Sequence, residues 1–159
     1  MSPLSKLTPR CAGLVLAAVL LSVQPATAAA KDRGPPQDFF ALLANDVAVQ
    51  VLASPVFQAR TDGGRKVKIV IGDVINNSDD EGVRVEDLFN EIRNQIVSAG
   101  TTRLFAPGEL NVDFVIAPEL TSSIATDAKG RRQRCFTLNL TLTKPSGEFA
   151  LAQKAKRCG

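Results

Sequence analysis

The segment from Phe136 to Thr143 alternates apolar and polar side chains without a break. Phe and Leu occupy the even-numbered positions from 136 to 142, and Thr and Asn occupy the odd-numbered positions from 137 to 143. Because side chains of a β-strand point alternately to its two faces, this pattern predicts a strand with one buried and one solvent-facing side. Lys144-Pro-Ser-Gly147 has the composition of a tight turn, and an apolar segment follows it. We therefore expect a β-hairpin that covers part of a hydrophobic core.

The two halves of this hairpin can be set in register from the turn between them. A loop centred between Ser146 and Gly147 places Cys135 directly opposite Cys158. Opposed residues at a non-hydrogen-bonded site lie about 4.5 Å apart at Cα, close enough for a disulfide to join them. A register shifted by two residues would keep the same faces but separate the sulfurs, and two free buried thiols are a further alternative. The centred register predicts a Cys135–Cys158 disulfide, as expected in an oxidising compartment.

The first thirty residues have the pattern of a signal peptide that is cleaved on export. Lys6 and Arg10 precede a 13-residue apolar stretch, and small residues suit cleavage after Ala28 or Ala30. A membrane anchor is the alternative, but such a span needs about 20 apolar residues. Cys11 precedes the apolar stretch rather than following it, so it is not a lipidation site. The sequence predicts a periplasmic protein with no lipid anchor and no membrane span after cleavage.

The rest of the chain predicts a short extended leader over residues 31–37 and one α+β domain over residues 38–159. Apolar stripes at helical spacing predict helices from Phe39 to Leu52, with Asp38 as N-cap and Pro55 ending the segment, and within residues 83–100. Residues 121–133 are expected to form a long flexible arm. Strands are predicted at residues 67–75, 102–106, 112–120, 134–143 and 148–158. The expected fold class is α+β, with two helices packed on one mostly antiparallel sheet of four or five strands.

The polar segment from Asn76 to Glu81 could be a site or only a turn. A calcium loop of the helix-loop-helix kind needs acidic oxygens at alternating positions, but the two residues after Asp73 are apolar and the spacing fails. Asp79 and Asp80 are adjacent and point apart, so they are poor partners for acid and base chemistry. We interpret the segment as a polar turn between a strand and a helix.

The composition argues against an enzyme. The 159 residues contain no His, Trp or Tyr, with 45% apolar and 22% charged residues. Without His, Ser-His-Asp and Cys-His catalysis and most zinc chemistry are excluded. The sequence therefore predicts a non-enzymatic chain with no catalytic residue, no metal site and no cofactor.

Charge is distributed unevenly along the chain. Between Asp73 and Asp127 there are eleven acids and three bases, whereas from Lys129 to the end there are eight bases and one acid. Such asymmetry often marks an interaction face, although solvated charge is the simpler explanation. Six bases fall at the open end of the predicted hairpin, and we call them the basic set: Arg131, Arg132, Arg134, Lys154, Lys156 and Arg157. We expect them to bind a partner, but not nucleic acid, because no aromatic residues are interleaved with them.

Several stretches carry a family resemblance that extends over nearly all of residues 37–157. They are "LASP" from Leu52, "IGDVINNS" from Ile71, "IRNQIVSAGTTRLF" from Ile92, "DFVIAPELTS" from Asp113 and "FTLNLTLTKPSG" from Phe136. In this order they resemble the periplasmic domain of the LpoB-type lipoproteins, activators of penicillin-binding proteins, which are distantly similar in architecture to the N-terminal domain of TolB. Pro118 stands where family members tend to carry Gly, which predicts a bulge or an edge strand there.

The resemblance implies a function by contact. The first hypothesis is a non-enzymatic periplasmic adaptor that docks on an envelope enzyme, above all a peptidoglycan synthase of the penicillin-binding protein class, and shifts its conformational equilibrium. The alternative is a structural subunit of an outer-membrane secretion or assembly complex, since related folds build such assemblies. A third possibility, a hydrolase using Asp and Glu, requires a deep pocket lined by two carboxylates.

Overall fold

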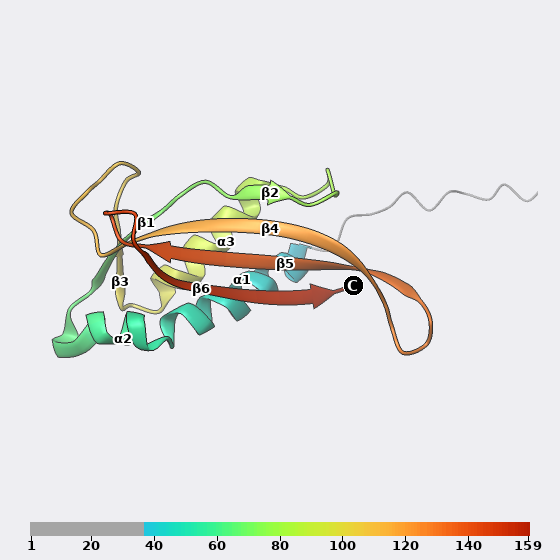
Figure 1. The fold of residues 1–159 in the computed structure, drawn as a ribbon, viewed down its shortest axis with the longest axis horizontal. Helices are drawn as coiled ribbons and strands as arrows, with labels where there is room; N and C mark the ends of the chain where they lie inside the picture. Colours follow the sequence, from blue (N-terminus) through green and yellow to red (C-terminus); the bar gives the residue numbers. More distant parts are fainter. Residues whose placement is uncertain (1–36) are drawn as a thin grey trace, which may run out of the picture. The chain divides into compact units, whose positions relative to one another are not determined.

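The structure is a computed structural model that describes residues 37–159, so the predicted signal peptide and residues 31–36 of the leader lie outside the described residues. Figure 1 shows the arrangement of the elements in space. Their order along the chain is α1 (Gln37–Leu52), α2 (Pro55–Thr61), the 3-10 helix η1 (Asp62–Gly64), β1 (Val67–Ile71), β2 (Ile75–Asn77), α3 (Val85–Ser98), β3 (Thr102–Leu104), β4 (Phe114–Thr126), β5 (Arg132–Thr143) and β6 (Phe149–Cys158).

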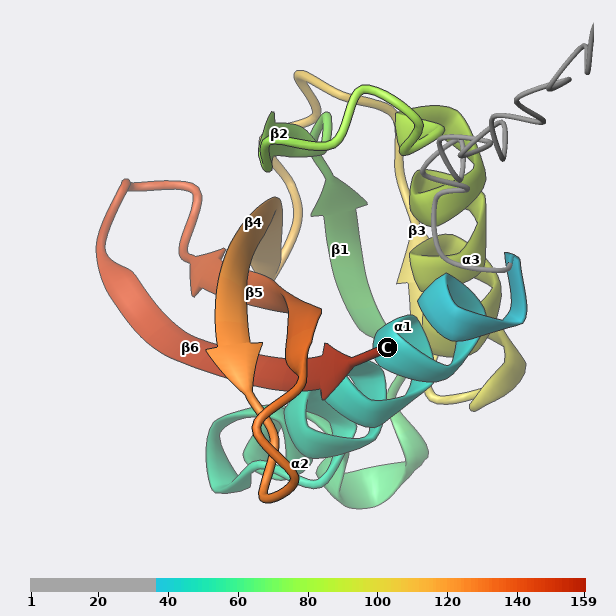
Figure 2. The same ribbon diagram turned by 90° about the vertical axis from the view of Figure 1, so that its right-hand side faces the viewer.

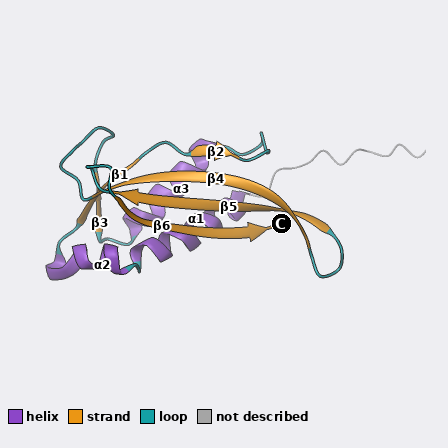
Figure 3. Ribbon diagram, viewed as in Figure 1, coloured by secondary structure: helices purple, strands orange, loops and turns teal. Residues whose placement is uncertain are grey.

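The strands form one six-stranded mixed sheet in the order β3-β1-β4-β5-β6, with β2 also paired to β4 (Figure 3). β1 is parallel to β3 and β4, and β2 is parallel to β4, whereas the long strand β5 is antiparallel to both of its neighbours, β4 and β6. The predicted α+β class is confirmed. The sheet has one strand more than expected because the predicted strand 67–75 is divided between β1 and β2.

Pro118 explains this division. The amide of Gly72 donates to the carbonyl of Ile116 at 2.8 Å, so the backbone N–H and C=O of Ile116 point toward β1. Because these groups point alternately to the two neighbouring strands, the backbone nitrogen of Pro118, two residues later, also points toward the β1 side. Proline has no N–H to continue that ladder. β1 accordingly leaves β4 after the Ile71–Ile116 pair, and β2 joins it opposite Glu119. The predicted bulge or edge strand is wrong: β4 is a central strand, and the break falls in its partner.

α1 and α3 lie on one face of the sheet, and their apolar stripes build the core against β5 (Figure 2). The even-numbered positions of β5 from Phe136 to Leu142 face the helices and are at most 1% exposed, which confirms the predicted inward face. α1 and α3 contribute six Leu, Val and Ile residues that are also at most 1% exposed: Leu43, Val47, Val51, Leu88, Ile92 and Ile96. Burial of each such side chain stabilises the fold by about 1.5–3 kcal/mol.

The boundaries of α1 and α3 are close to the prediction and differ at the start of α1. α1 begins at Gln37, so Asp38 lies in its first turn, where the helix dipole favours an acid, rather than at the N-cap. α3 extends from Val85 to Ser98, within the predicted range of residues 83–100, and Ala99 is its C-cap. Gly100 follows with φ +70°, a conformation that favours glycine and ends the helix.

The short helix α2 was not predicted from the sequence. Ser54 caps it: its hydroxyl accepts from the amide of Phe57 at 3.3 Å and donates to the carbonyl of Val51 at 2.6 Å. Pro55 occupies the first turn, where a missing N–H costs nothing. Pro55 therefore ends α1 and also starts the next helix. α2 buries Phe57, whose ring lies 6.4 Å from the ring of Phe114 at the start of β4.

The flexible arm expected at residues 121–133 is also wrong. β4 continues to Thr126 and pairs residue by residue with β5, leaving only a short turn between the strands. One Asp127 carboxylate oxygen accepts from the amides of Lys129 and Arg131, each at 2.8 Å. The backbone and side-chain hydrogen bonds from Arg131 hold the pKa of Asp127 below its usual value. Gly130, with φ +77°, completes the turn.

The β5–β6 hairpin has the register that the sequence predicts. Leu138 pairs with Ala155 and Cys135 pairs with Cys158, with one irregularity beside the turn at Leu142/Thr143. A disulfide joins the two cysteines, whose Cα atoms are 3.9 Å apart.

Within residues 37–159 no single helix is long and apolar enough to cross a bilayer. α1 and α2 reach that length and composition only when counted together across a 66° bend.

Candidate interaction surface

The structure divides the basic set between the two faces of the sheet. Arg134 and Arg157 share the helix-covered face with Phe136, because even positions of β5 pair with odd positions of β6. Lys154 and Lys156 lie on the opposite face and are exposed, as is Arg132 near the start of β5. The six residues therefore do not form one surface.

Three arginines of the basic set form ion pairs within the chain. Arg157 contacts Asp46 of α1 at 2.6 Å and ties the end of β6 to that helix. The hydrogen bond that Arg157 donates to the Asp46 carboxylate raises the pKa of the Arg157 guanidinium. Arg134 contacts Asp80 at 3.2 Å, and Arg131 contacts Asp127 at 2.7 Å. In the described part of the chain, Lys154, Lys156 and Arg132 have no ion pair.

We call the side of β4, β5 and β6 that faces away from α1 and α3 the open face (Figures 1 and 2). On β5 it carries the Thr and Asn side chains of the odd-numbered positions from 137 to 143. It contains a hollow of about 720 Å³. The strands line this hollow with Glu119, Thr121, Thr137, Asn139, Ala152 and Lys154. Asn77 of β2 donates to Glu119 at 2.8 Å, which fixes that carboxylate at one side of the hollow. The open face therefore carries the Glu119 carboxylate on β4 and the Lys154 ammonium on β6, and between them lie the Asn139 amide and the Thr137 hydroxyl of β5.

A second hollow, of about 410 Å³, lies between α1 and the outer edge of β6, and we call it the edge groove. Asn45, Asp46, Val49 and Gln50 form its helical wall, and residues 154–156 form its strand wall. Gln50 and Lys154 line both hollows. The edge groove therefore joins the open face at the margin of the sheet.

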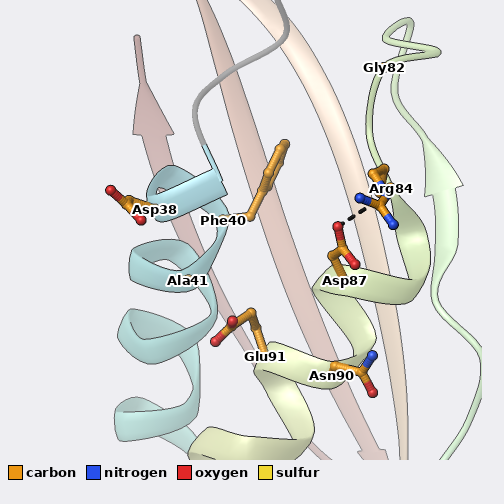
Figure 4. Close-up of a pocket in the computed structure, with 8 residues that line it drawn as sticks. All are labelled: Asp38, Phe40, Ala41, Gly82, Arg84, Asp87, Asn90 and Glu91. Atoms are coloured by element: carbon orange, nitrogen blue, oxygen red, sulfur yellow. Dashed lines mark ion pairs between the residues drawn. The ribbon is translucent and has the colours of Figure 1, made fainter.

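A cleft of about 320 Å³ lies between the first turns of α1 and α3 (Figure 4). Because several carboxylates line it, this cleft is the place where a hydrolase that uses Asp and Glu would have its active site. Asp38, Asp87 and Glu91 line it, together with Arg84 and Phe40. Asp87 is bound to Arg84 at 3.2 Å, and Asp38 points away from that pair on the far side of α1. The carboxylates do not converge on one point, which general acid and base catalysis requires.

The polar segment from Asn76 to Glu81 uses its side chains to hold its own backbone. The side-chain oxygen Oδ1 of Asn76 accepts hydrogen bonds from the backbone amide and the hydroxyl of Ser78, at 3.0 and 2.6 Å. Asp80 accepts from the amide of Gly82 at 2.9 Å. These are turn-forming bonds of the kind that Asn and Asp make before helices. Across the described residues, no group of three or more His, Cys, Asp or Glu side chains is placed to hold a metal ion.

Asp113 is a structural carboxylate that the sequence did not single out. It accepts hydrogen bonds from the Arg65 guanidinium and, at 2.9 Å, from the amide of Lys68, while Arg60 lies 3.9 Å away. Burial opposes ionisation of this carboxyl, but the two hydrogen bonds and the positive charges of Arg65 and Arg60 hold its pKa below the usual 3.8. Asp113 thus joins β4 to β1 and to the segment that contains α2.

The sequence reasoning overlooked the open face and the edge groove. The outward positions of the strands were visible as alternating Thr and Asn, but alternation does not show which face lacks a helical cover. The edge position of β6 depends on strand order, which local patterns do not determine.

Known structures share this arrangement. The C-terminal domain of LpoB from Salmonella enterica superposes with a TM-score of 0.53 at 11% sequence identity, over 74% of this chain and 97% of that domain. The C-terminal domain of LpoB from Escherichia coli gives the same score, identity and coverage. No protein-family model matches the chain, and no curated protein matches it. The chain therefore has the fold of the LpoB C-terminal domain.

Proposed function

We propose that this chain is a non-enzymatic adaptor of the bacterial envelope, which docks on a peptidoglycan synthase of the penicillin-binding protein class and alters its activity. The observation that carries the proposal is the likeness to the LpoB C-terminal domain, which extends over 97% of that domain. The sequence resemblance points to the same lipoproteins, whose role is to activate penicillin-binding proteins. The N-terminal pattern supports export to the periplasm, where such a synthase acts.

The use of the carboxylates supports a function without catalysis. Asp46, Asp80, Asp113 and Asp127 each bind an arginine, and Glu119 binds Asn77. Such carboxylates serve the fold rather than acid and base chemistry. The open face and the edge groove, in contrast, offer polar and charged groups that a protein partner can contact without any rearrangement of the core.

An adaptor alters an enzyme only if it binds two states of that enzyme with different affinity. The expected result is therefore a change in synthase rate that saturates with adaptor concentration, together with direct binding of the two proteins. The adaptor alone should turn over no substrate.

The test uses the chain purified from the periplasm after export and the purified bifunctional synthases of the same bacterium. Binding is measured by biolayer interferometry, and glycan polymerisation is followed on a lipid-linked precursor with and without the chain. A saturable change in polymerisation supports the proposal. Absence of binding to every synthase, together with a high-mass assembly in gel filtration, would favour a structural subunit of an outer-membrane complex instead.

A further inference from the structure

β6 is an edge strand with free backbone hydrogen-bonding groups. Among the described strands it pairs with β5 alone. The amide of Gly159 donates to the carbonyl of Arg134 at 3.0 Å, so odd-numbered residues of β6 bond to β5 and even-numbered residues direct N–H and C=O outward. Those residues are Ala152, Lys154 and Lys156, and all three are exposed. Within residues 37–159 no hydrogen bond reaches their outward backbone groups from another element.

The surroundings of this edge form two different walls. On the helix side, the edge groove is lined by Val49 of α1, which is 55% exposed, and by the polar residues Asn45, Asp46 and Gln50. Leu42, which is 49% exposed, lies two helical turns earlier on the same side of α1. On the other side, Lys154 and Lys156 extend over the open face and have no ion pair in the described part of the chain. The edge thus lies between a mostly polar helical wall, on which Val49 is an exposed apolar side chain, and a basic wall on the open face.

We propose that β6 accepts an extended, acidic segment of a partner protein as an additional strand of the sheet. Backbone bonds to Ala152, Lys154 and Lys156 would hold the segment, as in other recognition by strand addition. Because side chains of the added strand alternate between its two faces, every second residue would be apolar and contact α1, and the others would be Glu or Asp and face the two lysines. This inference rests on the proposed function for the existence of a protein partner and adds where that partner binds.

A second copy of this chain fits the edge less well than an acidic partner. Antiparallel pairing of two β6 strands about a two-fold axis would place Lys154 and Lys156 close to the same lysines of the other copy. Like charges opposite one another on a sheet destabilise the pair, and lysines on an edge strand are a common protection against self-association. The lysines therefore select for an acidic strand.

The edge is held rigid before any partner arrives. The disulfide fixes Cys158, the last residue of β6, to β5, and the Arg157–Asp46 ion pair fixes the same end to α1. A strand that is already ordered loses less conformational entropy on binding. This gives the disulfide a role in recognition beyond protection of the C-terminus from fraying.

The test uses the chain purified after export and three peptides of about ten residues, a length that matches one strand. One alternates Glu and Val, one alternates Lys and Val, and one has the composition of the first in two blocks. With the alternating acidic peptide, we expect the amide resonances of Ala152, Lys154 and Lys156 to shift and become protected from hydrogen exchange. The other two peptides should bind about tenfold more weakly or not at all.

Two variants probe the two parts of the proposal. Lys154→Pro removes one outward N–H that β5 does not use, and the double variant Lys154→Glu, Lys156→Glu reverses the charge without changing the backbone. Each variant should lower the affinity for the acidic peptide by about tenfold or more. The control Lys66→Glu, at an exposed lysine outside the sheet, should change the affinity for the same peptide by less than about twofold. Circular dichroism of each variant checks that the fold is intact.

The outcomes separate this inference from the proposed function. Perturbation of residues away from β6 by the acidic peptide, or equal binding of the wild type and the double-lysine variant, overturns strand addition. Protection of the β6 amides without peptide, increasing with protein concentration, identifies a second copy as the occupant. If a synthase binds the wild type and the double-lysine variant equally, the proposed adaptor function is supported and β6 is rejected as the binding site. If the acidic peptide binds specifically at β6 but no synthase binds the chain, strand addition is supported and the proposed adaptor function is rejected.

Discussion

The covered face and the open face of β5 differ in what their side chains touch. At the even positions from 136 to 142, side chains are at most 1% exposed and pack against α1 and α3. At the odd positions from 137 to 143, side chains are half-buried and lie on the side of the sheet that faces away from α1 and α3. The same strand therefore supports stability on one side and leaves the other side available for a partner.

The largest effect is expected from a cavity on the covered face. Leu138 is fully buried, so Leu138→Ala removes apolar contacts that the surrounding side chains cannot replace. We expect the free energy of unfolding to fall by about 2–5 kcal/mol, measured by urea denaturation. The matched control is Thr137→Ala on the other face of the same strand, with an expected loss below about 1 kcal/mol. Equal losses at both positions would contradict the division between the faces.

The second prediction concerns the bond that fixes the end of β6 to β5. The disulfide joins residues separated by 23 positions, and its removal releases the entropy of that loop in the unfolded chain. The double variant Cys135→Ala, Cys158→Ala should lose about 2–4 kcal/mol in urea denaturation. Wild-type protein treated with a reductant should show a similar loss. A double variant as stable as the oxidised wild type would show that the hairpin alone orders this edge.

The third prediction concerns Asp113, just before β4, and compares its contribution to the free energy of unfolding with that of the buried apolar side chains. Asp113 is 8% exposed at its side chain and accepts from Arg65 and the Lys68 amide. Asp113→Asn keeps the shape but removes the charge, and we expect a loss of about 1–3 kcal/mol at pH 7.

The pH dependence of the Asp113 effect has a definite sign. Because the pKa of Asp113 is lower in the folded chain than in the unfolded chain, its contribution is present above the unfolded pKa and disappears as the pH falls through the folded pKa. The difference in unfolding free energy between wild type and Asp113→Asn should therefore shrink below about pH 4. A difference that stays constant down to pH 2 would show that the carboxylate charge is not the cause.

Two hairpin turns show what the sequence could and could not predict. Gly147 donates to the carbonyl of Lys144 at 2.8 Å, and Gly130 donates to the carbonyl of Asp127 at 3.0 Å, so the two turns have the same backbone bonds and each has a Gly at its fourth position. The first was predicted because strict alternation precedes it. The second was missed because residues 121–123 are small and polar and the apolar residues Ile124 and Ala125 are adjacent, so the segment shows no hydrophobic alternation.

The remaining misses have a common physical cause. β2 exists because Pro118, far away in sequence, forces β4 to change partners. α2 was missed because Pro55 ends one helix and begins the next, although Ser54 before it is a readable N-cap signal. In the basic set, the acids that bind Arg134 and Arg157 come from residues 54 and 111 positions away, and such pairings follow from the tertiary fold.

The smallest effect is expected from the lysines of the open face. The double variant Lys154→Ala, Lys156→Ala removes two exposed side chains that have no ion pair in the described residues, so the free energy of unfolding should change by less than about 0.5 kcal/mol. Arg157→Ala, one residue further along the same strand, loses its bond to Asp46 and should destabilise the chain measurably more in the same urea titration. If the lysine variant is the more destabilised of the two, the lysines support the fold and are not reserved for a partner. If it is as stable as the wild type, any loss of partner binding in it can be assigned to the surface itself.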